Sequence, residues 1–221
     1  MERRHLGIAL LVIATLSQTA PADFGELALA GRAGTLGFGG ELMINLLPTV
    51  NGRFGATYLP LGVGGDFGDI NYDFNLRVLT FPLTIDWYPF KGGFHLSGGA
   101  IFNQTRMDLD AGSNASITLG GHTYSADEVG RLHGRARFNR VAPYVGLGWG
   151  NAFGREKRWG ILTDLGVAFL GQPHVALSAT GPIATDPTFT SDLAQQRREV
   201  EDDLSILRFY PVASISLFFR F

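Results

Sequence analysis

Apolar and polar side chains alternate along the last sixteen residues of the chain, from Ile206 to Phe221. The apolar positions share one parity, interrupted at Pro211, and comprise Leu207, Phe209, Ala213, Ile215, Leu217, Phe219 and Phe221. Successive side chains of a strand point to opposite faces. The segment therefore predicts a strand with one apolar face and one polar face.

The same period of two predicts six further strands upstream. They are expected at residues 35–46, after the turn at 47–49, at 70–87, after the turn at 89–93, before the turn at 154–158, and from 159 onward. Between Ile70 and Trp87 the apolar parity changes from even to odd after Val78. We interpret this change as a β-bulge, because a one-residue slip moves every later side chain to the other face.

Long polar segments join the strands at one end and short turns join them at the other. Residues 60–69, 108–134 and 171–203 are expected as external loops, and the three turns above as periplasmic, which is the asymmetry that outer-membrane barrels show. Ile117–Tyr124 predicts a small hairpin, and Ser125–Glu128 has the capping-box pattern of one helical turn. Ser191–Leu204 is expected to be a surface helix, since it is polar nearly all round.

The number of strands favours a closed barrel. Such barrels have an even number of strands, so an eighth is expected at Glu26–Ala33. The expected fold is all-β: a closed antiparallel eight-stranded transmembrane β-barrel, an up-and-down meander with long external loops and one short loop helix. Spanning strands of about 9–11 residues fit easily into the chain that follows residue 22.

The N-terminus predicts secretion. Arg3 and Arg4 precede an apolar stretch that is too short for a spanning helix, and Ala20-Pro21-Ala22 has the form of a signal cleavage site. We expect residues 1–22 to be a signal peptide and residues 23–221 to be the outer-membrane β-barrel. Of the 18 basic and 20 acidic residues, 16 and 19 then remain, a net charge of −3, which gives no reason to expect a nucleic-acid partner. The chain has no cysteine, which excludes disulfides and thiolate metal sites, and we expect no cofactor and no metal.

Aromatic residues gather beside the predicted periplasmic turns. Trp87, Tyr88, Trp149 and Trp159 are expected to form a girdle at that membrane interface.

Charged residues fall on the polar parity of the strands. A charge on the lipid face costs about 2–4 kcal/mol at the midplane, so these side chains are expected to form a network in the lumen. The predicted members are Glu41, Arg53, Arg77, Asp86, His95, Arg140, Asp164 and Arg208. Since side chains fill the interior of an eight-stranded barrel, we favour an ion-paired plug over a narrow polar path for a small zwitterion or cation.

Two other groups of residues suggest chemistry. His95 and Ser97 share a face, but they point inward near the periplasmic end, where a lipid-acting site could not reach lipid, so we do not expect an enzyme. Arg131, Arg135 and Arg137 alternate along one face of the external part of the sixth strand. They line either a solvated part of the wall or a contact with lipopolysaccharide phosphates, which arginine binds well.

Several segments carry a resemblance to a known family. Val141–Gly150, Asp86–Phe94, Asp164–Val167 with Gly171–Pro173, and Tyr210–Val212 resemble the ornithine- and carbapenem-associated (CarO-type) outer-membrane barrels. Phe219 and Phe221 resemble the terminal signal read by the barrel-assembly machinery. The resemblance implies an eight-stranded, largely occluded barrel in the cell outer membrane, linked to uptake of basic amino acids.

Two functions follow as hypotheses. The first is a small-solute uptake or channel protein without cofactor, because acidic external segments could concentrate a small cation at the mouth. The alternative is an occluded structural or surface-interaction barrel that contacts outer-membrane lipid, lipopolysaccharide or external partners.

Overall fold

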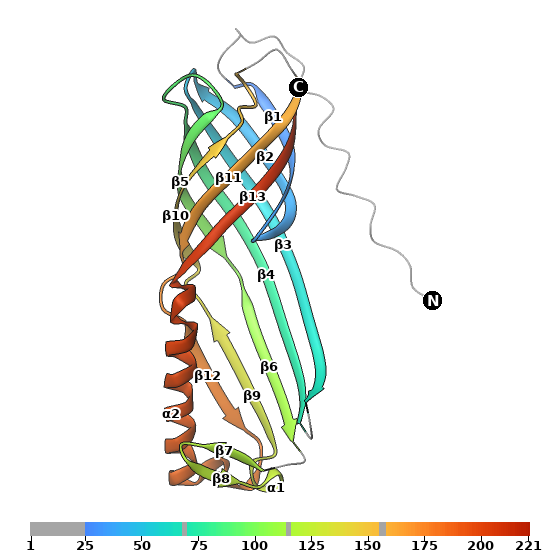
Figure 1. Cartoon of the computed structure of the whole chain (residues 1–221), viewed down its shortest axis with the longest axis vertical. Coiled ribbons are helices and arrows are strands. Elements are labelled where there is room, and N and C mark those ends of the chain that lie inside the picture. The colour runs from blue at the N-terminus through green and yellow to red at the C-terminus, as the bar shows by residue number, and fades with distance from the viewer. Residues whose placement is uncertain (1–24, 68–69, 114–115, 155–157) are drawn as a thin grey trace, which may run out of the picture.

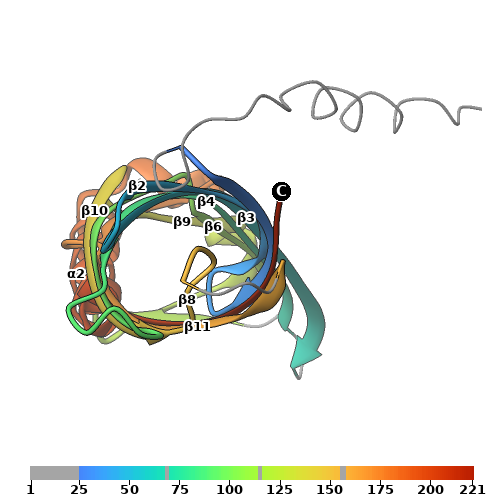
Figure 2. The same cartoon turned by 90° about the horizontal axis from the view of Figure 1, so that it is seen from above.

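The computed structural model describes residues 25–67, 70–113, 116–154 and 158–221, and eight of its strands close into a barrel (Figures 1 and 2). These strands are β1 (Leu27–Gly34), β2 (Gly37–Leu47), β3 (Val50–Phe67), β4 (Ile70–Trp87), β5 (Phe94–Asn103), β10 (Val141–Trp149), β11 (Trp159–Phe169) and β13 (Phe209–Arg220). Each pairs antiparallel with its neighbours, and β1 pairs with β13 from Ala28↔Arg220 to Gly34↔Ser214. The predicted closed eight-stranded barrel is confirmed, including the eighth strand near the N-terminus. The expected signal peptide lies outside the described residues.

Beyond the barrel, the wall continues as a sheet on one side only (Figure 1). The far halves of β3 and β4 are joined there by β6 (Arg106–Ser113), β9 (Arg131–Arg137) and β12 (His174–Ala179), in the order β3-β4-β6-β9-β12. We call this part the outer sheet. It lies at the end opposite the C-terminus. The expectation of loops at 60–69 and 108–134 was therefore wrong for most of these residues. The strands continue beyond the barrel, because pairing with neighbouring strands satisfies their backbone N–H and C=O groups.

The far end of the outer sheet is covered by short elements and flanked by one helix. They are β7 (Ile117–Leu119), β8 (His122–Tyr124), α1 (Ala126–Val129), η1 (Pro182–Thr185), α2 (Pro187–Asp203) and η2 (Leu204–Arg208). The predicted hairpin is confirmed as β7–β8, and its turn uses Gly120 and Gly121 at φ of 58° and 87°, as a tight hairpin requires. The capping box of α1 is also confirmed, because the Glu128 carboxylate accepts from the Ser125 N–H and hydroxyl.

Helix α2 begins earlier than its polarity predicts and is not only a surface element. The Asp186 carboxylate caps it by accepting from the N–H groups of Thr188 and Phe189. Phe189 is fully buried against Leu119 and Val129, so the helix anchors the covering elements to the outer sheet. Glu201 near its C-terminus accepts from the Val175 N–H of β12.

The predicted bulge in β4 is wrong. Pairing with β3 keeps one register from Val50↔Trp87 to Phe67↔Ile70, and pairing with β5 and β6 also continues in one register. Even-numbered positions of β4 therefore lie on one face throughout. Within the barrel the odd-numbered residues Leu83, Ile85 and Trp87 are apolar and exposed to lipid, and Arg77 shares their parity.

The outside of the barrel is apolar and exposed, as lipid contact requires. Trp87, Trp149 and Trp159 are 52%, 65% and 63% exposed beside the turns near the C-terminus, where the predicted girdle was expected. Tyr88 is not part of this girdle, because it has the inward parity of Asp86 and is buried next to His95. At the other end a second set of exposed aromatic residues, not foreseen from the sequence, comprises Phe38, Tyr58, Phe102, Phe169 and Phe209. In the described parts of the chain no helix has the length and apolar character needed to cross a membrane.

Candidate functional site

Arg53 of β3 lies at the centre of an ion-paired cluster inside the barrel. Its guanidinium donates to both oxygens of Asp164, with Nη1–Oδ2 and Nη2–Oδ1 distances of 2.9 and 3.0 Å. It donates from Nη2 to Asp86 Oδ1 at 2.7 Å, and Nε lies 2.6 Å from Asp86 Oδ2 as an unaligned ion-pair contact. Glu41 Oε1 is 3.4 Å from Nη1. One arginine of β3 thus links β2, β4 and β11 across the lumen.

Two further residues complete this charge network. Arg32 of β1 donates to Glu41 Oε2 at 2.5 Å, and its second amino group lies 3.9 Å from Asp164. His95 of β5 places Nε2 3.0 Å from Asp164 Oδ1 and Nδ1 3.4 Å from the Gly93 carbonyl. We call Arg32, Glu41, Arg53, Asp86, His95 and Asp164 the charged layer.

Hydroxyl groups add hydrogen bonds to carboxylate oxygens that also accept from Arg53. Ser97 donates to Asp86 at 2.7 Å, and Ser214 donates to Asp164 at 3.2 Å. Asp86 and His95 are fully buried and Arg53 is 3% exposed. The charges are therefore paired away from bulk water, which is the condition under which buried charges persist in proteins.

A cluster of buried apolar side chains lies on each side of the charged layer. Toward the periplasmic turns, an apolar layer is formed by Ala28, Ala30, Met43, Ala152, Leu162 and Phe218. Toward the outer sheet, a second is formed by Leu36, Ile101, Ala142, Tyr144, Ala168 and Val212. Neither layer offers charged groups to a hydrated ion.

A glycine makes room for the imidazole of the charged layer. A Cβ atom at Gly148 of β10 would lie 2.4 Å from His95 Nε2 and 2.3 Å from the Thr163 carbonyl oxygen. The close approach of two strands and a ring is possible there only without a side chain.

The structure brings together five of the eight residues predicted for the lumen. Glu41, Arg53, Asp86, His95 and Asp164 meet in the charged layer, whereas Arg77, Arg140 and Arg208 are exposed and lie outside it. Arg77 was misplaced by the supposed bulge, which inverted its face. Arg140 and Arg208 precede the first residues of β10 and β13, so strand parity does not apply to them.

Arg32 belongs to the charged layer but was missed. It lies in the sequence Ala30-Gly31-Arg32-Ala33-Gly34, where small residues give no alternation from which to assign a face. Its register partners, Gly39 on β2 and Ser216 on β13, fix it inside the wall.

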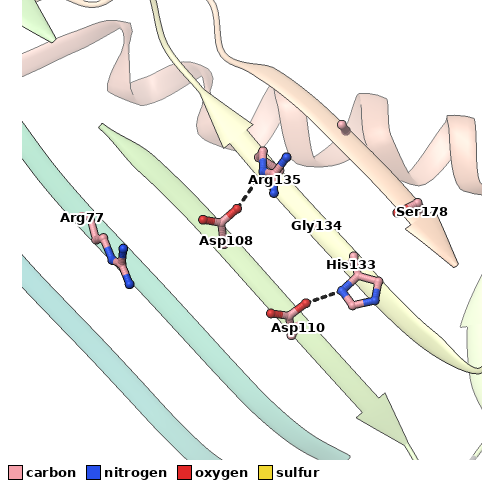
Figure 3. Close-up of a pocket in the computed structure, with 8 residues that line it drawn as sticks. Arg77, Asp108, Asp110, His133, Gly134, Arg135 and Ser178 are labelled. Atoms are coloured by element: carbon pink, nitrogen blue, oxygen red, sulfur yellow. Dashed lines mark hydrogen bonds and ion pairs between the residues drawn. The ribbon is translucent and has the colours of Figure 1, made fainter. Parts of the chain in front are cut away.

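The arginines considered for lipopolysaccharide lie on β9 in the outer sheet. Arg135 donates from Nε to Asp108 at 2.8 Å, and His133 pairs with Asp110 (Figure 3). The Asp108 carboxylate raises the pKa of Arg135 above its usual value. Together with Arg77 these residues line a shallow cavity of about 540 Å³. Arg131 and Arg137 are exposed, as are Phe219 and Phe221 at the end of the chain.

His95 and Ser97, which share a face, form hydrogen bonds with different carboxylates. The Ser97 hydroxyl contacts Asp86 and Arg53, and His95 contacts Asp164. Within the described residues, no group of three His, Asp or Glu side chains could hold a metal ion.

Comparison with solved structures identifies the fold. The chain matches CarO2 of Acinetobacter baumannii with a TM-score of 0.60 and 22% identity, over 90% of this chain and 100% of that one. It matches CarO of the same organism with a TM-score of 0.56 and 22% identity, over 88% and 97%. No family model matches the sequence, and no curated protein does. The chain therefore has the CarO type of outer-membrane β-barrel fold, as the sequence resemblance predicted.

Proposed function

We propose that this chain is an outer-membrane barrel that is closed to solutes and acts through the outer sheet it presents above the membrane. The observation that carries the proposal is the charged layer, in which Arg53 binds three carboxylates between two apolar layers. A conducting path needs continuous hydration, whereas in this packing each charged side chain of the layer is paired with another. The exposed apolar exterior and the likeness to CarO support the outer membrane as its location.

Solute uptake is the second candidate. Mixed charges in the lumen favour it, because a small cation or basic amino acid could exchange with Arg32 or Arg53 if the layer opened. Such opening would have to separate Arg53 from both Asp86 and Asp164, each of which it contacts through two nitrogen–oxygen pairs. Removing one partner from a buried pair costs about 3–5 kcal/mol, so the open state would be rare.

Electrical recording separates the two functions. Residues 23–221, refolded and shown to be folded by heat-dependent gel migration, are inserted into planar bilayers with and without ornithine. A large open porin serves as the positive control for insertion and recording. We expect no stepwise conductance from the folded protein and no effect of ornithine. Reproducible conductance steps that scale with the amount of folded protein would overturn the closed-barrel proposal.

A further inference from the structure

Three arginines lie side by side where the barrel passes into the outer sheet. Arg77 of β4 pairs in register with Arg106 of β6. Strands β6 and β9 pair as far as Met107↔Ala136, and continuing this register by one residue places Arg106 opposite Arg137 of β9. Arg137 in turn pairs with His174 of β12. We call Arg77, Arg106 and Arg137 the rim row. All three side chains are exposed.

The rim row faces the lipid side of the wall. Because β4 keeps one register, Arg77 has the same parity as Leu83, Ile85 and Trp87, which are exposed on the outside of the barrel. Cross-strand partners share a face, so Arg106 and Arg137 point the same way.

Its height matches the outer interface of the membrane. Ten residues of β4 separate Arg77 from Trp87 in the periplasmic girdle. At about 3.3 Å per residue and a tilt of about 40°, this is about 25 Å along the barrel axis, the height of the apolar band of such barrels. The rim row therefore lies where lipid headgroups begin.

The row concentrates positive charge that the adjacent carboxylates do not balance. Like charges directly opposite one another on a sheet are unfavourable. Asp108 and Asp110 follow Arg106 by two and four residues on β6, farther from the membrane. They are paired with Arg135 and His133, respectively (Figure 3). Arg140 and Arg208 add exposed positive charge at the same rim, and the Arg208 guanidinium carbon lies 5.7 Å from the centre of the Phe209 ring.

We propose that the rim row binds the phosphate groups of lipopolysaccharide in the outer leaflet. Arginine binds phosphate through two parallel N–H donors, and three adjacent guanidinium groups can hold a phosphorylated sugar at its headgroup. The inference rests on the proposed membrane location. Of the three arginines that the sequence suggested for this contact, Arg137 belongs to the rim row. Arg135 is occupied by Asp108, and Arg131 lies six residues beyond Arg137, about 15 Å farther from the membrane at the same rise and tilt.

Binding of bisphosphorylated lipid A to the detergent-refolded protein tests the inference. The rim variant carries Arg77→Gln, Arg106→Gln and Arg137→Gln. The matched control carries Arg131→Gln, Arg197→Gln and Arg198→Gln, which remove the same charge from exposed positions of the outer sheet and α2. An arginine near an anionic lipid surface strengthens binding about fivefold. We expect the rim variant to bind at least 25-fold more weakly and the control to bind within threefold of the parent protein.

Lipid A without phosphate separates headgroup recognition from acyl-chain contact. We expect the parent protein to bind it about as weakly as the rim variant does. Equal binding of the two lipids, or equal losses in the rim and control variants, would overturn the inference. Heat-dependent gel migration and insertion into vesicles are measured on the same samples, so failure of the membrane location itself would be seen separately as absence of insertion.

Discussion

Replacement of Arg53 by methionine tests whether the charged layer is a dry structural plug. Methionine fits the space of the arginine stem without carrying charge. The change leaves Asp86 without the guanidinium that contacts both its oxygens, and takes from Asp164 two bonds of 2.9 and 3.0 Å. Arg32 remains paired with Glu41 at 2.5 Å, and its other amino group lies 3.9 Å from Asp164.

The expected loss is large because the partners are buried. Breaking a buried ion pair by removing one member costs about 3–5 kcal/mol, and here two carboxylates lose their principal partner, so we expect the upper part of that range. The matched control is Arg135→Met, which removes an exposed pair with Asp108 whose side chains are 56% and 40% exposed. Exposed pairs contribute about 0–1 kcal/mol.

Urea unfolding from lipid vesicles, followed by tryptophan fluorescence, measures both variants. Trp87, Trp149 and Trp159 lie at the interface and report loss of the barrel. Adding Asp86→Asn and Asp164→Asn to Arg53→Met should recover part of the stability, because the buried negative charges disappear with the positive one. A loss below about 1 kcal/mol for Arg53→Met, equal to that of Arg135→Met, would mean that water reaches the layer and would refute the argument.

Three further predictions concern packing, assembly and pH. Gly148→Ala should destabilise the barrel by about 1–3 kcal/mol through overpacking against His95, whereas Gly31→Ala, with nothing within 4 Å of the new Cβ, should be tolerated in the same unfolding assay. Phe221→Ala should lower the amount of assembled barrel in outer-membrane fractions more than Phe209→Ala, although both rings are similarly exposed at 60% and 57%; equal levels would contradict a terminal assembly signal. Hydrogen bonds from Tyr124 and His122 of β8 lower the pKa of Asp192 in α2. The stability that this contact between β8 and α2 contributes is therefore complete above the ordinary aspartate pKa and is lost as the pH falls through the lowered pKa. Hydrogen exchange at β7–β8 should therefore rise in acid, and Asp192→Asn should show fast exchange at neutral pH as well.

The barrel could be predicted because lipid and lumen impose opposite polarity on adjacent residues. His95, Leu96 and Ser97 show this directly: the leucine is exposed to lipid and its two neighbours are buried inside. The resulting alternation located the strands and placed Glu41, Arg53, Asp86 and Asp164 on the inner face. It could not show that Arg53 pairs with carboxylates of three strands, because that depends on the tilt of the strands and on side-chain length.

The error at Arg77 arose because the polarity of a residue reports its environment and not its face alone. The change of parity in β4 at Val78 is not a change of register, because the pairing with β3 continues through it. A bulge at this position would place Arg77 in the lumen, on the face opposite the other arginines of the rim row. Arg32 could not be assigned to a face because its neighbours are Ala and Gly, which occur in both lipid-facing and lumen-facing positions.

The same distinction between environment and face argues for where the function lies. Inside the barrel, each charged side chain of the charged layer pairs with one on another strand. These pairs link β1, β2, β3, β4, β5 and β11 to one another. Outside the membrane, β3 and β4 are prolonged far beyond the length that spanning requires, and three further strands and a helix are added to them. This one-sided sheet lies outside the closed part of the barrel. A protein that meets lipopolysaccharide and external molecules at the cell surface would present it to them, with the rim row setting its height on the membrane.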